Sequence, residues 1–130
     1  MRWYATLFVP VALFVAASAF PDAPALTVTL RCPAKVAAGR VRCDVEAVPS
    51  RGSTLSWADV VILPGSLAPL RGRLAPADGE VRPERAAFGF ALLATDHGPA
   101  EVRVAVRAVV CGDAGCNATS VERRIDVVVE

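Results

Sequence analysis

The chain has 130 residues, of which 54% are hydrophobic and only 21% are charged, so it has enough apolar surface for one folded core and is not expected to be disordered. Its 14 basic and 13 acidic side chains nearly balance, which excludes the strongly basic surface typical of nucleic-acid binding or of attachment to an anionic membrane. Ten prolines and nine glycines, spread along the chain, favour many short segments over long helices.

The first 19 residues have the parts of a secretory signal peptide. Arg2 precedes an apolar run of about 15 residues, and Ala17-Ser18-Ala19 forms a small-residue cleavage site. A membrane anchor is the alternative, but the run is shorter than the roughly 20 helical residues that a bilayer needs, and Pro10 interrupts it. We therefore expect cleavage after residue 19 and export of residues 20–130 as one domain, with no membrane span once the leader is removed.

Apolar and polar residues alternate with a period of two along most of the remaining chain, which predicts β-strands. The predicted strands are residues 26–32, 41–46, 54–63, 86–94, 102–110 and 121–129, with 67–74 as a short strand or an irregular edge. Turns and loops rich in proline, glycine and polar residues separate them, at 33–39, 75–84 and 95–99. Seven or eight short strands joined in this way indicate an all-β fold, an antiparallel β-sandwich that is immunoglobulin-like in outline.

The chain has four cysteines, and in an exported protein an even number of cysteines indicates a disulfide framework. Four cysteines allow three pairings. Cys111 and Cys116 flank Gly112-Asp113-Ala114-Gly115, so a hairpin closed by this stretch would place them opposite each other on adjacent strands, within reach of a disulfide. Cys32 and Cys43 flank the first predicted hairpin and share its apolar face, which makes them the natural second pair.

The two pairs are predicted to differ in their surroundings. The first pair along the chain lies on an apolar strand face, so its disulfide should be buried, inert and structural. Cys111 instead shares a face with Arg103 and Arg107 at a hairpin tip, so its bond to Cys116 should be accessible to a partner's thiol. Two alternatives remain for this pair: a second structural disulfide, and a four-thiolate metal site, which export and the absence of a CxxC spacing disfavour.

A known family shares the sequence pattern around Cys111 and Cys116. Residues 104–116, Val-Ala-Val-Arg-Ala-Val-Val-Cys-Gly-Asp-Ala-Gly-Cys, together with the strand ending at 125–129, resemble the N-terminal periplasmic domain of the thiol:disulfide interchange protein DsbD. In that family a strand runs into a cysteine, a short loop, a second cysteine and a final strand. The segment 56–65 is similar to a further strand of the family, so the resemblance spans roughly 28–129, with the cysteine loop as its specific part.

The resemblance implies an immunoglobulin-like thiol:disulfide oxidoreductase, in the bacterial periplasm or secreted, that needs no cofactor and no metal. A membrane thiol–disulfide protein would reduce its cysteine pair, which would then reduce a thioredoxin-like partner. By position, the catalytic residues would be Cys116 as the nucleophile and Cys111 as the resolving thiol. Asp78 and Glu80 would be acidic neighbours of the pair, in the segment where the family has a shielding loop. We expect a monomer.

The chain also departs from the family pattern. Asn117-Ala118-Thr119 stands where family members have a proline-containing segment, and residues 73–80 lack the aromatic side chains of the shielding loop. The alternative interpretation is therefore a non-catalytic immunoglobulin-like protein-binding module with two structural disulfides. The sequence motifs of serine hydrolases, zinc proteases and nucleotide-binding enzymes do not occur, which disfavours those classes.

Overall fold

The structure is a computed structural model that describes residues 25–130; the predicted signal peptide lies outside the described residues. Ten strands and one short 3-10 helix follow in chain order. They are β1 (Leu26–Arg31), β2 (Lys35–Val36), β3 (Gly39–Pro49), β4 (Thr54–Leu63), β5 (Ala68–Pro69), β6 (Arg73–Leu74), η1 (Pro76–Asp78), β7 (Glu80–Arg82), β8 (Arg85–Ala94), β9 (Gly98–Gly112) and β10 (Gly115–Val129).

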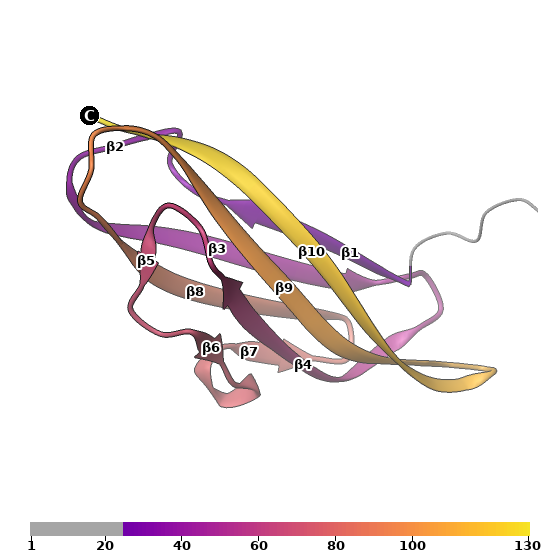
Figure 1. Cartoon of the computed structure of the whole chain (residues 1–130). Coiled ribbons are helices and arrows are strands. Elements are labelled where there is room, and N and C mark those ends of the chain that lie inside the picture. The colour runs from indigo at the N-terminus through magenta and orange to yellow at the C-terminus, as the bar shows by residue number, and fades with distance from the viewer. Residues whose placement is uncertain (1–24) are drawn as a thin grey trace, which may run out of the picture.

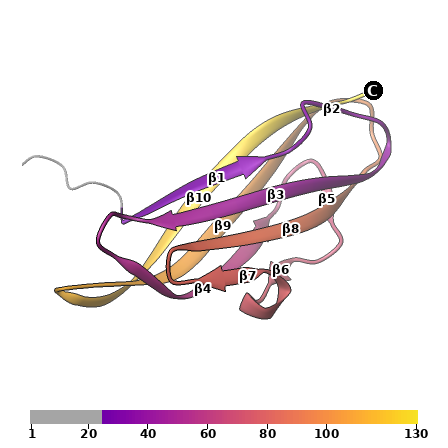
Figure 2. The ribbon, with the colours of Figure 1, turned by 180° about the vertical axis from the view of Figure 1, so that it is seen from behind.

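The strands form two sheets that pack face to face (Figure 1). Sheet A has the strand order β1-β3-β8-β5, with β7 also paired to β8, and is seen from its outer side in Figure 2. Sheet B has the order β2-β10-β9-β4-β6. Every pairing is antiparallel except that of β2 with the end of β10, which is parallel. The predicted all-β sandwich is thus confirmed, and seven of its strands have three or more residues.

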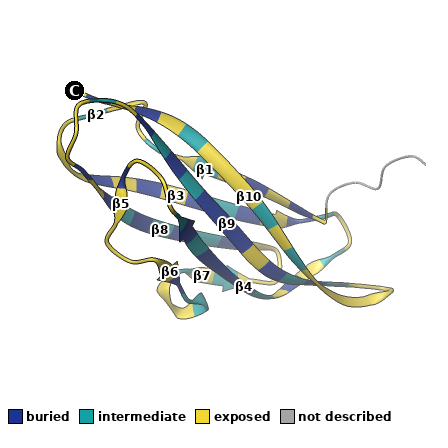
Figure 3. Cartoon of the chain, in the orientation of Figure 1, coloured by how far each residue is buried: buried dark blue, intermediate teal, exposed yellow. Residues whose placement is uncertain are grey.

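The core follows from the period-two alternation that the sequence shows. In β9 and in β3, buried residues alternate with more exposed ones (Figure 3). This is expected because successive side chains of a strand point to opposite faces of the sheet, and one face packs on the other sheet. The buried members of these two strands include Val102, Val104, Val106, Ala108 and Val110 in β9 and Val41, Cys43, Val45 and Ala47 in β3. Because both sheets contribute small β-branched side chains, the apolar layer between them is continuous.

Several segments differ from the prediction. The turn expected at 33–39 contains strand β2, Lys35–Val36. Residues 75–84, expected to be a loop, contain η1 and strand β7, because Val81 pairs with Ala86 of β8 and packs against the core. Residues 67–74 contain two separate two-residue strands, β5 and β6, which belong to different sheets. The last strand was expected from residue 121 but begins at Gly115, so β10 carries the second cysteine of the hairpin within the strand itself.

Candidate functional site

Strands β9 and β10 form one long hairpin. They pair without interruption from Gly98 with Val129 to Gly112 with Gly115, and only Asp113 and Ala114 remain in the loop. Gly115 has a φ of 109°, a left-handed conformation that favours glycine and lets the chain reverse within so short a turn. The hairpin therefore keeps its strand register up to its tip.

This register places the two cysteines of the hairpin directly opposite each other. Cys111 of β9 pairs with Cys116 of β10, their Cα atoms are 4.0 Å apart, and the two sulfurs form a disulfide. The short Cα separation is that of a non-hydrogen-bonded pair in an antiparallel ladder. Cys116 is exposed and Cys111 is half-buried. The expected pairing at the hairpin tip is confirmed.

The second disulfide joins Cys32, just after β1, to Cys43 of β3, with Cα atoms 4.5 Å apart. Cys43 has no exposed surface and belongs to the core, and Cys32 packs against it from the edge. Both ends of this bond belong to sheet A, whereas the hairpin disulfide lies wholly in sheet B. Neither bond connects the two sheets.

The hairpin disulfide lies at the end of the outer face of sheet B. Because side chains alternate along each strand, the next outward-facing row across β4, β9 and β10 consists of Trp57, Val109 and Ala118. A shift in register between Leu55 and Trp57 turns the indole to this outer face. These side chains and those of the following row line a shallow hollow of about 400 Å³.

The row beyond Trp57 contains a buried carboxylate held by two arginines. Asp59 of β4 has no exposed surface and accepts a hydrogen bond of 2.8 Å at Oδ1 from Nε of Arg107. Arg107 also donates to Oδ2 through Nη2, and Arg73 of β6 donates to Oδ2 through Nε at 2.8 Å. The side chains of both arginines are about half exposed. They cover the carboxylate, so the cluster of Asp59, Arg73 and Arg107 carries one net positive charge.

The hydrogen bonds set the protonation of this cluster. Those from Arg107, with a smaller contribution from Arg73, lower the pKa of Asp59 below its ordinary value, although burial alone would raise it. The same contact raises the pKa of Arg107. Asp59 is therefore an anion at neutral pH and serves to hold two guanidinium groups in place on the outer face of sheet B.

The two acidic residues that the family resemblance suggested as neighbours of the disulfide have other partners. Asp78, at the end of η1, forms an ion pair with Arg71 at 2.9 Å and accepts a hydrogen bond from the backbone N–H of Ala75 at 2.7 Å. That backbone hydrogen bond, with the pair to Arg71, lowers the pKa of Asp78. Glu80 of β7 pairs with Arg82 at 2.5 Å. The structure thus joins both carboxylates to arginines and brings neither into contact with the hairpin disulfide.

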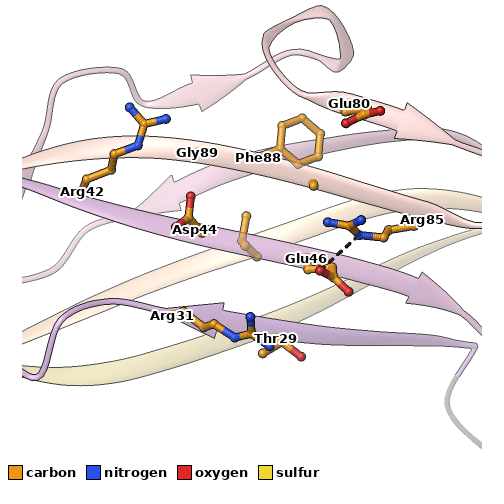
Figure 4. A pocket seen from close by; sticks show the side chains of 11 residues that line it. Thr29, Arg31, Arg42, Asp44, Glu46, Glu80, Arg85, Phe88 and Gly89 are labelled. Carbon is orange, nitrogen blue, oxygen red and sulfur yellow. Dashed lines mark ion pairs between the residues drawn. The ribbon is translucent and has the colours of Figure 1, made fainter.

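A second groove lies on the outer face of sheet A, where small residues of β8 leave space between longer side chains (Figure 4). Gly89 forms part of its floor, and Arg42 and Asp44 of β3 stand beside it. Glu46 and Arg85 form an ion pair of 3.1 Å within it. Its three arginines are matched by three carboxylates, so the groove has no net charge and indicates no particular ligand.

The Asp59 cluster is the part of this site that sequence reasoning missed. Asp59 stands in a predicted strand whose neighbours are apolar, and an isolated acid in such a strand is the available signal. Its partners are 14 and 48 residues away, however, and only strand pairing shows that they meet. Among residues 25–130 there is no group of three side chains suited to holding a metal ion, and no helix there is both long and apolar enough to cross a bilayer.

Comparison with known proteins gives a distant likeness only. No protein-family model matches the chain, and no curated protein matches its sequence. Among solved structures it is similar to AggA, the major subunit of aggregative adherence fimbriae type I from Escherichia coli, with a TM-score of 0.43 and 7% identity. The alignment covers 81% of this chain and 95% of AggA.

Proposed function

We propose that this protein is an exported thiol–disulfide exchange domain, which passes reducing equivalents to a thioredoxin-like partner through Cys111 and Cys116. The proposal joins the resemblance of the cysteine loop to the DsbD N-terminal domain with the chemistry available at the hairpin tip. Two disulfides in a small domain are typical of an oxidising compartment, which supports an extracellular or periplasmic location.

The observation that carries the proposal is the contrast in exposure between the two bonds. Cys43 has no exposed surface and Cys32 is half-buried, so the first disulfide offers a thiol less access than the bond at the hairpin tip. Cys116 is exposed at the tip of a hairpin that projects beyond the neighbouring strands (Figure 1). A thiolate must approach a disulfide sulfur directly for exchange, so access separates the two bonds chemically.

The proposed cycle balances in two-electron steps. In the reduced protein, the Cys116 thiolate attacks a disulfide of the partner, forms a mixed disulfide and releases one partner thiolate. The Cys111 thiolate then attacks the Cys116 sulfur, which releases the second partner thiolate and forms the Cys111–Cys116 disulfide. The partner is reduced by two electrons and gains two protons. A membrane dithiol protein supplies the two electrons and two protons again when it reduces the hairpin disulfide.

The reduction potential of the hairpin disulfide tests this function. We expect a value above about −300 mV, outside the range of resistant structural disulfides. A Cys111→Ser variant should trap a thioredoxin-like protein as a mixed disulfide on Cys116, and a Cys116→Ser variant, the matched control, should not. A potential well below −300 mV, or equal trapping by both variants, would exclude the relay.

A second candidate function is a non-catalytic binding module with two structural disulfides. The observation in its favour is the outer face of sheet B, where an apolar hollow beside Trp57 is bordered by the guanidinium groups above Asp59. Here a Cys111→Ser/Cys116→Ser double variant would capture its protein partner as strongly as the wild type. Loss of capture by a folded double variant would count against the module and for the relay.

A further inference from the structure

Within residues 25–130, strand β10 has a long edge that pairs with no other strand. Among the described residues, its partners are β9 along its whole length and β2 only at Val128 and Val129. The stretch from Cys116 to Asp126 therefore has no strand on its second side within residues 25–130, and in Figure 1 it runs along the border of the sandwich. A regular edge of this length is a template for pairing with another extended chain.

The hydrogen bonds to β2 show which backbone groups face this edge. Val128 donates its N–H to Ala34 at 2.9 Å, and Glu130 donates to Val36 at 2.8 Å, so the even-numbered residues of β10 point their N–H groups away from β9. This alternation continues along the strand, because non-hydrogen-bonded pairs with β9 recur at every second residue. The short Cα separation of the Cys111–Cys116 pair fits the same register.

The same even-numbered residues carry the side chains of the outer face. Cys116, Ala118 and Ser120 are all exposed. Each is the edge member of a row of side chains that runs across the outer face of the sheet, from β10 toward β9. The row of Ala118 leads over Val109 to the ring of Trp57, and the row of Ser120 leads to Arg107. Small side chains at the edge thus leave the apolar hollow open toward an incoming strand.

We propose that the edge from Cys116 to Ser120 receives an extended segment of the dithiol protein that reduces the hairpin disulfide, as an added antiparallel strand. The segment has the order aromatic residue, any residue, cysteine. Its cysteine lies opposite Cys116, and its ring lies over Ala118 toward Trp57. The proposal rests on the exchange function above and assigns the chemistry by which this dithiol protein is recognised.

The geometry of strand pairing supports this arrangement. Directly opposite residues of a hydrogen-bonded antiparallel pair have Cα atoms about 5.5 Å apart, which a disulfide can span. Arg107 takes no part in the recognition, because its guanidinium turns to Asp59 on the β4 side, away from β10. Beyond Ser120 the edge is less suited to pairing, because Arg123 on the inner side donates to the carbonyl of Val28 at 3.1 Å.

The step between the oxidised protein and such a segment is a balanced exchange. The thiolate of the segment attacks the sulfur of Cys116, forms a mixed disulfide and releases Cys111 as a thiolate. No further oxidant or reductant takes part. Strand pairing raises the rate of this step because it holds the two sulfurs close together. A small thiol such as glutathione forms no such strand pairing and gains no such increase in rate.

The test compares three thiols on the oxidised protein, with the mixed disulfide quantified by mass spectrometry. They are the capped peptide Glu-Thr-Phe-Thr-Cys, the swapped peptide Phe-Thr-Glu-Thr-Cys and glutathione. Ser120→Pro removes one outward N–H without touching the ladder to β9, and Ser120→Ala is the matched control. We expect the first peptide to react about tenfold faster than the other thiols. Ser120→Pro should abolish this advantage while the glutathione rate stays within about twofold.

Two outcomes overturn the inference: equal rates for the two peptides on the wild type, or an advantage that survives in Ser120→Pro. A bond that reacts with none of the three thiols would exclude the exchange function instead. Strand addition is then measured without any exchange, using the peptide Glu-Thr-Phe-Thr-Ser, which has no thiol. Its binding is followed by the amide shifts of Ala118 and Ser120 in NMR spectra. A shift of the Ala118 amide that vanishes in Ser120→Pro but persists in Ser120→Ala supports the docking edge, and its absence in the wild type refutes it.

Discussion

Arg107 of β9 donates two hydrogen bonds to Asp59 of β4, directly opposite it in sheet B, and so covers a carboxylate that has no exposed surface of its own. Asp59 is the one buried charged residue among those the structure describes. The pair links the central strands of sheet B on the outer face, where apolar packing from sheet A does not reach. Its energetic and protonation consequences can both be measured.

Replacing Asp59 by alanine should destabilise the fold by about 2 kcal/mol, because hydrogen bonds between charged groups are lost and two arginines lose their shared anion. Urea denaturation of Asp59→Ala at pH 7 checks this value. Asp126→Ala, on the exposed face of β10, is the control and should change stability by less than about 0.5 kcal/mol. Equal effects of the two substitutions would show that the cluster does not stabilise the protein.

The free energy of unfolding should fall in acid, because the Asp59 carboxylate becomes protonated. The pKa of Asp59 is lowered in the folded state, whereas in the unfolded chain it is about 3.9. Its contribution is therefore complete above the unfolded pKa and is lost as the pH falls through the lower, folded pKa. Asp78, whose pKa is also lowered, acts in the same direction. Urea midpoints between pH 7 and pH 2 should fall less steeply for Asp59→Asn than for the wild type; parallel curves would contradict this.

The two disulfides should differ in their effect on stability and in their accessibility. Loop entropy predicts a loss of about 2 kcal/mol for Cys111→Ala/Cys116→Ala and about 3 kcal/mol for Cys32→Ala/Cys43→Ala. The loss of stability for Cys32→Ala/Cys43→Ala should be larger still, because Cys43 packs in the core. Under native conditions, dithiothreitol followed by alkylation should label Cys116 well before Cys43. Simultaneous labelling would mean that the first bond is not protected.

A close approach at η1 gives a further prediction. A Cβ atom on Gly79 would lie 2.5 Å from the Ala87 carbonyl oxygen and closer still to the Phe88 ring, whereas one on Gly72 would meet nothing within 4 Å. Gly79→Ala should therefore destabilise the fold by about 1 to 3 kcal/mol. Gly72→Ala, the matched control, should be neutral or stabilising by up to about 1 kcal/mol. Thermal unfolding distinguishes the two; equal melting temperatures would contradict the steric argument.

The features that could be predicted from the sequence are those that depend on the local alternation of apolar and polar residues. The strands of β9 and β10 could be predicted because their alternation is long and regular, and the pairing of Cys111 with Cys116 follows from the turn between them. Strand β7 has only three residues, Glu80–Arg82, too few to show a period, and it forms because β8 offers it an edge. The Asp59 cluster depends on the register of β4 against β9, which a bulge shifts and which no local pattern encodes.

Each disulfide begins and ends within one sheet, so no covalent bond crosses the core. The two layers are held against each other by side-chain packing, which does not depend on the oxidation state of any sulfur. Opening the hairpin bond would therefore be a local event that leaves the sandwich assembled. Under the proposed exchange function, the hairpin bond would open and close without the domain passing through an unfolded state.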